Sequence, residues 1–234
     1  MGTDAVPSGL YGKLPAKRDF IAVGTSRGFL KTWEHWMQAG LSASRLALGN
    51  AWQDAFLTAP IWRFWLGERI CGEPVLGAFM PSVDGIGRYF PLTLFHRSEA
   101  GDPLAPPEYD DRAAWFSQAE AVLLSALAHD ARFEDVAEAA DRLPAPDLTE
   151  TDPAQVGAVR ARDGTLVSAA DIGAFPRVLA ELRTIDRCRV HSGMSYWWTT
   201  GGDGFAPRVA ANLGMPSAEL FAGMLSGRFT GEMP

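Results

Sequence analysis

The amino-acid sequence predicts a single α/β domain, spanning residues 1–234, in which a sheet lies between layers of helices. Of its 234 residues, 47% are hydrophobic and 21% are charged, a composition typical of a globular protein with its own core. Strand-like and helix-like patterns follow each other without a break that would mark a second domain. A turn signal at Asp84-Gly85 joins two strand patterns as a hairpin, so we expect a mixed, largely antiparallel sheet.

The first predicted elements are a strand and a long helix. Residues 9–14 have the composition of a short strand, which Pro15 ends because proline cannot continue a ladder. From Ser26, whose hydroxyl can cap a helix, apolar residues recur every three or four positions, with one gap at Ser44, as far as Gly49-Asn50. A short helix over 51–57 follows.

Three further strands are expected in the first hundred residues. The stretch 61–66 is rich in β-branched and aromatic residues, and 75–80 and 86–95 form the two arms of the hairpin. Their nearly continuous apolar runs, without clean alternation, predict strands that are covered on both faces.

The second half is expected to be mostly helical. Apolar stripes at helical spacing predict three helices, over 110–129, 133–143 and 172–185. The Pro-rich, acidic stretch 143–167 predicts a long loop. A buried strand over 194–200 and a last helix, capped by Ser217 and ending at Leu225, complete the expected fold.

The negative charge is concentrated in the middle of the chain. Residues 101–152 carry 13 acidic against 3 basic residues, whereas the whole chain has a net charge of −7. No basic stripe stands out elsewhere, so we expect neither nucleic acid nor an anionic membrane surface as a partner. The acidic segment is more typical of a solvated helical face than of a docking site.

The sequence indicates a cytoplasmic protein without membrane insertion, metal or cofactor. Its two cysteines, Cys71 and Cys188, lie far apart, and neither a signal peptide nor a transmembrane run is present. The four histidines form no pair at metal-ligand spacing, and no glycine-rich phosphate loop precedes a helix.

One catalytic pattern matches. Gly24-Thr25-Ser26-Arg27-Gly28 fits the G-x-S-x-G nucleophile elbow of serine hydrolases. The motif lies too close to the N-terminus for that fold, no oxyanion-hole motif accompanies it, and a helix cap explains Ser26 equally well. We therefore predict no catalytic residue and keep a serine hydrolase as an alternative. A small-molecule-binding domain lined by tryptophans is a further alternative.

Four charged residues lie among aromatic residues of the N-terminal half, namely Asp19, Arg63, Asp84 and Arg88. Unpaired charges in such surroundings are costly, so these residues are expected to form ion pairs or turn hydrogen bonds. The functional alternative is a recognition groove or an acid/base pair.

Several motifs in residues 9–93 resemble one bacterial family. The opening Gly9-Leu-Tyr-Gly-Lys-Leu-Pro15, followed by Arg18-Asp19-Phe20, resembles the start of the TagF (ImpM) family, which is associated with type VI secretion. The most specific part is Met80-Pro-Ser-Val-Asp84 with Gly87-Arg88-Tyr-Phe-Pro-Leu-Thr93. Further along the chain only Tyr196-Trp-Trp-Thr199 resembles the family.

This resemblance implies a three-layer α-β-α sandwich and a non-enzymatic cytoplasmic accessory protein. Such a protein restrains type VI secretion after translation, in some members through the forkhead-associated scaffold protein, which is the expected partner here. The family supplies no catalytic residues. The motif residues Asp19, Arg63, Asp84 and Arg88 are therefore candidates for partner binding, with an architectural role as the alternative. The oligomeric state is not predicted.

Overall fold

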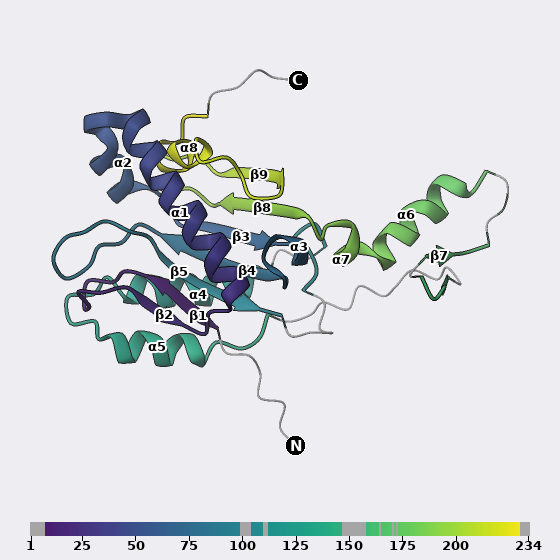
Figure 1. Cartoon of the computed structure of the whole chain (residues 1–234), viewed down its shortest axis with the longest axis horizontal. Helices are drawn as coiled ribbons and strands as arrows, with labels where there is room; N and C mark the ends of the chain where they lie inside the picture. The colour runs from purple at the N-terminus through teal and green to yellow at the C-terminus, as the bar shows by residue number, and fades with distance from the viewer. Residues whose placement is uncertain are drawn as a thin grey trace.

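A computed structural model describes residues 8–98, 104–109, 112–146, 158–163, 165–169, 171 and 173–229. Its centre is a seven-stranded sheet with helices against both faces (Figure 1). The strand order is β2-β1-β5-β4-β3-β8-β9, and every neighbouring pair is antiparallel. The α/β class is confirmed, whereas the expectation of a mixed sheet is corrected. The helices α1, η1 and α2 connect β2 to β3, but these two strands are not neighbours in the sheet. This connection therefore creates no parallel pair.

Most strands lie where the sequence predicts them. The sheet consists of β1 (Gly9–Gly12), β2 (Ile21–Val23), β3 (Trp62–Leu66), β4 (Val75–Met80), β5 (Leu92–Arg97), β8 (Met194–Thr199) and β9 (Arg208–Leu213). The sequence did not indicate β2 and β9, since β2 is very short and β9 is rich in alanine. The expected strand 86–95 begins only at Leu92. A small two-stranded sheet, β6 (Val159–Arg160) with β7 (Leu166–Val167), lies within the predicted loop 143–167.

The helices are α1 (Arg27–Leu48), the 3₁₀ helix η1 (Gly49–Ala51), α2 (Trp52–Thr58), α3 (Glu68–Cys71), α4 (Ala113–Ser125), α5 (Phe133–Asp141), α6 (Phe175–Ile185), α7 (Arg187–Val190) and α8 (Leu220–Ser226). The single-turn helices α3 and α7 were not predicted. Ser217 is not the N-cap of the last helix. Glu219 occupies that position, and its side chain makes no capping hydrogen bond. The carbonyl of Ser217 instead accepts from Leu220 in the preceding turn.

One face of the sheet packs against α1, α2 and α8 through aromatic side chains. Trp33 of α1 is fully buried and lies 4.3 Å from Phe64 and 5.8 Å from Trp197, measured between ring centroids. The Trp33 indole N–H donates to Thr93 Oγ1 at 3.0 Å, which ties the helix to β5. Trp36 and Phe221 extend the same cluster to α8.

The opposite face packs against α4 and α5. Trp65 of β3 and Phe116 of α4 belong to this second cluster, whereas Trp62 and Phe64 of β3 belong to the first. Neighbouring residues of a strand point to opposite faces, and here both faces are apolar. The continuous apolar runs are thereby explained, and the prediction of strands covered on both sides is confirmed. Acidic residues of α5, such as Glu134, lie on its exposed side.

The sheet ends at β9, which pairs with β8 along one edge only. Its Val209 and Leu213 are 81% and 79% exposed. In Figure 1, α6 and α7 extend sideways from the sheet, beyond the end at which α3 lies. Within the described ranges, no helix combines the length and the apolar character needed to cross a lipid bilayer.

Replacing Trp33 by alanine should lower the free energy of unfolding by about 3–5 kcal/mol, because the change leaves a cavity between α1 and the sheet. Leu46 lies on the same helix but is 90% exposed, so Leu46→Ala should change stability by no more than about 0.5 kcal/mol. Urea denaturation of both variants measures the difference. Equal losses would show that Trp33 does not anchor the first cluster.

Candidate functional site

The buried carboxylate of Asp84 joins the two segments that carry the most distinctive motifs. Its side chain is inaccessible to solvent. Oδ2 accepts hydrogen bonds from Lys13 Nζ at 2.8 Å and from Arg88 Nε at 2.6 Å. Oδ1 accepts from the backbone N–H groups of Ile86 at 3.1 Å and Arg88 at 2.8 Å. Both oxygens are satisfied, and two of the four donors carry a positive charge.

Further hydrogen bonds hold the loop 81–91 against the loop that follows β1. The N–H of Gly85 donates to the carbonyl of Lys17 at 2.8 Å, and the Arg88 guanidinium donates to the carbonyl of Arg18. A side chain at Gly85 would place its Cβ 3.0 Å from the carbonyl oxygen of Pro15, so a larger residue would require the two loops to move apart by a few tenths of an ångström.

The surroundings of Asp84 keep its carboxyl group ionised. Burial by itself would raise the pKa, but hydrogen bonds from Lys13 and from the backbone and side chain of Arg88 outweigh burial. The result is a pKa far below the ordinary value for aspartate. Asp84 therefore serves as a fixed negative charge that organises both loops, and its burial gives it an architectural role.

The outer side of the same loops is exposed and contains apolar and charged groups together. We call residues 18–20 and 85–88 the two-loop surface; every residue in it is exposed. Phe20 is 49% and Ile86 59% exposed. The centroids of the Phe20 and Phe90 rings lie 4.8 Å apart, and Lys13 Nζ lies 4.9 Å from the Phe20 ring centroid. The exposed Phe20 ring is therefore held in place by two buried residues.

The four charged candidates thus have different places. Arg88 reaches from the two-loop surface to the buried Asp84, and Asp19 is exposed on the neighbouring loop. Arg63 lies apart from them, because its Nε donates to Glu120 of α4 at 2.6 Å and its guanidinium lies 5.1 Å from the Phe116 ring centroid. This contact joins β3 to α4 in the second cluster. Whether any of the four binds a partner stays a prediction.

Lys13 was missed by the sequence reasoning, although it completes the site. It is only 5% exposed and lies directly after β1. The sequence could have indicated its role, because Lys13 lies between an apolar strand and Pro15, and a buried cation requires a carboxylate partner.

Ser26 has the geometry of a helix cap. Its backbone is extended, and its Oγ accepts a hydrogen bond from the N–H of Phe29 at 3.1 Å at the start of α1. Among the described residues, no hydrogen bond links Ser26 to a histidine. The motif Gly24–Gly28 is therefore explained by the cap and not by a nucleophile elbow.

Three tryptophans that the small-molecule alternative depends on, Trp62, Trp65 and Trp197, do not all lie on the same side of the sheet. Trp62 and Trp197 belong to one side of the sheet and Trp65 to the other. Their indole N–H groups donate to Met224 O at 2.9 Å, Ser195 Oγ at 2.9 Å and Leu104 O at 3.2 Å, respectively, which is the pattern of core residues.

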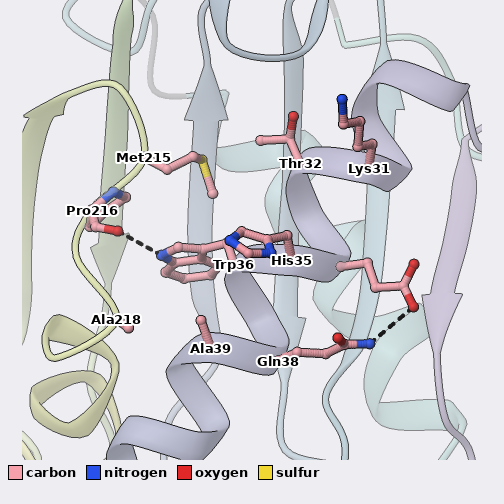
Figure 2. Close-up of a pocket in the computed structure, with 10 residues that line it drawn as sticks. Lys31, Thr32, His35, Trp36, Gln38, Ala39, Met215, Pro216 and Ala218 are labelled. Atoms are coloured by element: carbon pink, nitrogen blue, oxygen red, sulfur yellow. Dashed lines mark hydrogen bonds between the residues drawn. The ribbon is translucent and has the colours of Figure 1, made fainter.

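A surface hollow of about 820 Å³ lies elsewhere, between α1 and the segment before α8. Figure 2 shows Lys31, Thr32 and His35 of α1 on one side of it and Met215 and Pro216 on the other. The Trp36 N–H is already used, because it donates to the Pro216 carbonyl at 3.0 Å. No strong charge is concentrated there.

Within the described part of the chain, no group of three or more His, Cys, Asp or Glu side chains could hold a metal ion. Cys71 and Cys188 are free thiols. Burial raises the pKa of Cys71 to about 12, so this thiol stays protonated and is a poor nucleophile. Burial raises the pKa of Cys188 as well.

A family model described as "TagF N-terminal domain, Type VI secretion system-associated" matches residues 9–143, and the Asp84 site falls inside this range. The chain belongs to the TagF family. The crystal structure of PA0076 from Pseudomonas aeruginosa PAO1 is similar to it, with a TM-score of 0.77, 34% sequence identity and 97% of each chain covered. No curated protein matches. The chain is thus a type VI secretion system-associated protein, while its extent as one domain over 1–234 stays a prediction.

Neutralising Asp84 in this TagF protein should weaken the fold at neutral pH. Because the folded-state pKa is lowered, ionised Asp84 stabilises the protein above its unfolded pKa of about 4, and this contribution is lost as the pH falls further. Asp84→Asn removes the contribution, so its stability should depend less on pH between about 5 and 2. Urea denaturation at a series of pH values measures this.

Asp203 provides the matched control, because it is exposed and remote in sequence from both loops. Asp203→Asn should retain the acid sensitivity of the wild type. If Asp84→Asn and wild type lose stability in parallel on acidification, the Asp84 ion pair is not the source of that dependence.

Proposed function

We propose that this TagF protein is a cytoplasmic, non-enzymatic repressor that restrains type VI secretion after translation by binding the forkhead-associated scaffold protein of the system. One observation carries the proposal. The opening family motif and the most specific one meet around Asp84 and form the two-loop surface. The partner itself is taken from what the TagF family implies.

The composition of this surface supports a binding role. Apolar Phe20 and Ile86 lie next to Arg18, Asp19 and Arg88, and protein interfaces commonly combine an aromatic or aliphatic centre with arginine and a polar rim. The hydrogen bonds to Asp84 fix both loops before a partner arrives, which reduces the ordering cost of binding.

A hydrolase is a weaker explanation, because Ser26 Oγ is directed at a helix amide. The proposal also takes the domain as a three-layer α-β-α sandwich. The two apolar clusters, one on each side of the sheet, support this arrangement.

The test is a titration of the protein with the scaffold protein from the same secretion cluster. Ile86→Asp places a charge in the centre of the two-loop surface and should weaken binding about tenfold or more. Leu46→Asp makes the same change at an exposed position of α1, outside the surface, and should bind like wild type. Circular dichroism melting checks that both variants fold. Asp84 is avoided, because its loss would disturb the loops themselves.

Three outcomes separate the parts of the proposal. Loss of binding in Ile86→Asp alone supports the scaffold as partner and the two-loop surface as its site. If wild type, Ile86→Asp and Leu46→Asp bind equally well, the scaffold is a partner but the two-loop surface is not its binding site. A wild-type protein that does not bind the scaffold would overturn the proposed mechanism.

A further inference from the structure

A second hollow, of about 640 Å³, is lined by an unusual number of arginines. Arg69 of α3, Arg160 of β6, and Arg187 and Arg189 of α7 all contribute to it. Among the described residues, its lining contains two acidic side chains, Glu68 and Asp186, beside the four arginines, which gives this part of the lining a net charge of +2. The chain as a whole has a net charge of −7, so the positive charge of this lining is opposite in sign to that of the protein.

Backbone contacts fix the elements around this hollow. The N–H of Arg69 donates to the carbonyl of Ser192 at 2.8 Å, and the N–H of Gly67 donates to the carbonyl of Met194 at 2.9 Å. A Cβ at Gly67 would lie 2.4 Å from the Ser192 oxygen, so α3 packs directly against the segment that follows α7. Figure 1 shows these two short helices next to each other at one end of the sheet. Arg69 of α3 and the arginines of α7 therefore lie on elements that these backbone contacts hold together.

Of the two carboxylates, Asp186 already has partners within the lining. Asp186 accepts a hydrogen bond from Arg160 at 3.1 Å on Oδ1, and its Oδ2 lies 3.8 Å from Nη1 of Arg189. For Arg69 and Arg187, no ion pair is recorded among the described residues. Among the described residues, these two positive charges and the negative charge of Glu68 thus lie in the lining without an ion pair.

Arg187 adds a more specific observation. Its Nη1 donates to the Thr184 carbonyl at 3.2 Å, and its guanidinium lies 5.7 Å from the ring centroid of Tyr109. Its Nε is buried and has no hydrogen-bond partner in the described ranges. The contacts to Thr184 and Tyr109 thus hold the Arg187 guanidinium in place at the hollow without a carboxylate partner among the described residues.

We propose that this hollow is a binding site for a phosphate monoester group. Such a group carries a charge of about −1.5 to −2 near neutral pH, which matches the +2 of the lining, whereas a single carboxylate neutralises only half of it. The planar forks of arginine match the oxygens of phosphate in a bidentate manner. The volume lies in the range of small-ligand sites, about 300–1,000 Å³, so the group that carries the phosphate also has room. This site is independent of the scaffold-binding proposal, because its lining shares no residue with the two-loop surface.

The first experiment titrates ¹⁵N-labelled protein with inorganic phosphate at constant ionic strength and follows the arginine Nε–Hε signals. We expect saturable shifts at Arg69 and Arg187. Arg69→Ala removes an exposed side chain and should weaken phosphate binding about tenfold, the size of a lost charge-assisted contact. Arg69→Ala/Arg187→Ala should abolish binding. Arg142→Ala/Arg208→Ala removes two exposed arginines elsewhere and should leave the affinity unchanged.

The second experiment distinguishes the source of the group. A phosphoserine peptide, its unphosphorylated form and adenosine monophosphate compete with inorganic phosphate for the same signals. Displacement by the phosphopeptide or by the nucleotide supports the site and identifies its carrier. Chloride producing the same shifts as phosphate, or phosphate binding that persists in folded Arg69→Ala/Arg187→Ala, would overturn the proposal. Binding lost in the double variant while the scaffold still binds would show that the two sites are separate.

Discussion

A negative charge without access to water organises the proposed partner surface. The Asp84 carboxylate is tolerated there only while Lys13, Arg88 and two backbone N–H groups are directed at it. Lys13 belongs to the loop before β2, and the other donors belong to the loop before β5. The hydrogen bonds to Asp84 therefore fix the conformation of both loops. The buried Asp84 carboxylate therefore positions the exposed Phe20 and Ile86, although a partner on the surface would not contact that carboxylate.

The sequence was sufficient for the elements with a strong apolar pattern. The helix α1 was predicted from its apolar periodicity over twenty-two residues, and β3 and β4 were predicted from their high content of large apolar residues. The edge strand β9 could not be recognised, since it is rich in alanine and is a strand only because β8 offers it a partner. The late start of β5 has a local origin, because hydrogen bonds from Ile86 and Arg88 to Asp84 hold residues 84–88 in a turn outside the ladder.

The candidate site was predicted only in part, for a physical reason. Asp84 and Arg88 are four residues apart, so their pairing is local and visible in the sequence. Lys13 reaches the same carboxylate across a separation of 71 residues, which only the sheet brings about. Arg63 was grouped with them by its aromatic neighbours, but strand alternation directs it to the α4 side. The arginines of the second hollow come from three separate segments, which no local pattern connects.

The contact between Lys13 and Asp84 also determines when the two-loop surface can exist. Its halves come from opposite ends of the N-terminal hundred residues and meet only after β1 has paired with β5. A ribosome-bound chain that has not yet exposed β5, or a protein whose sheet has opened, presents neither loop in its native shape. Any partner that recognises this surface therefore recognises a chain in which β1 and β5 are already paired.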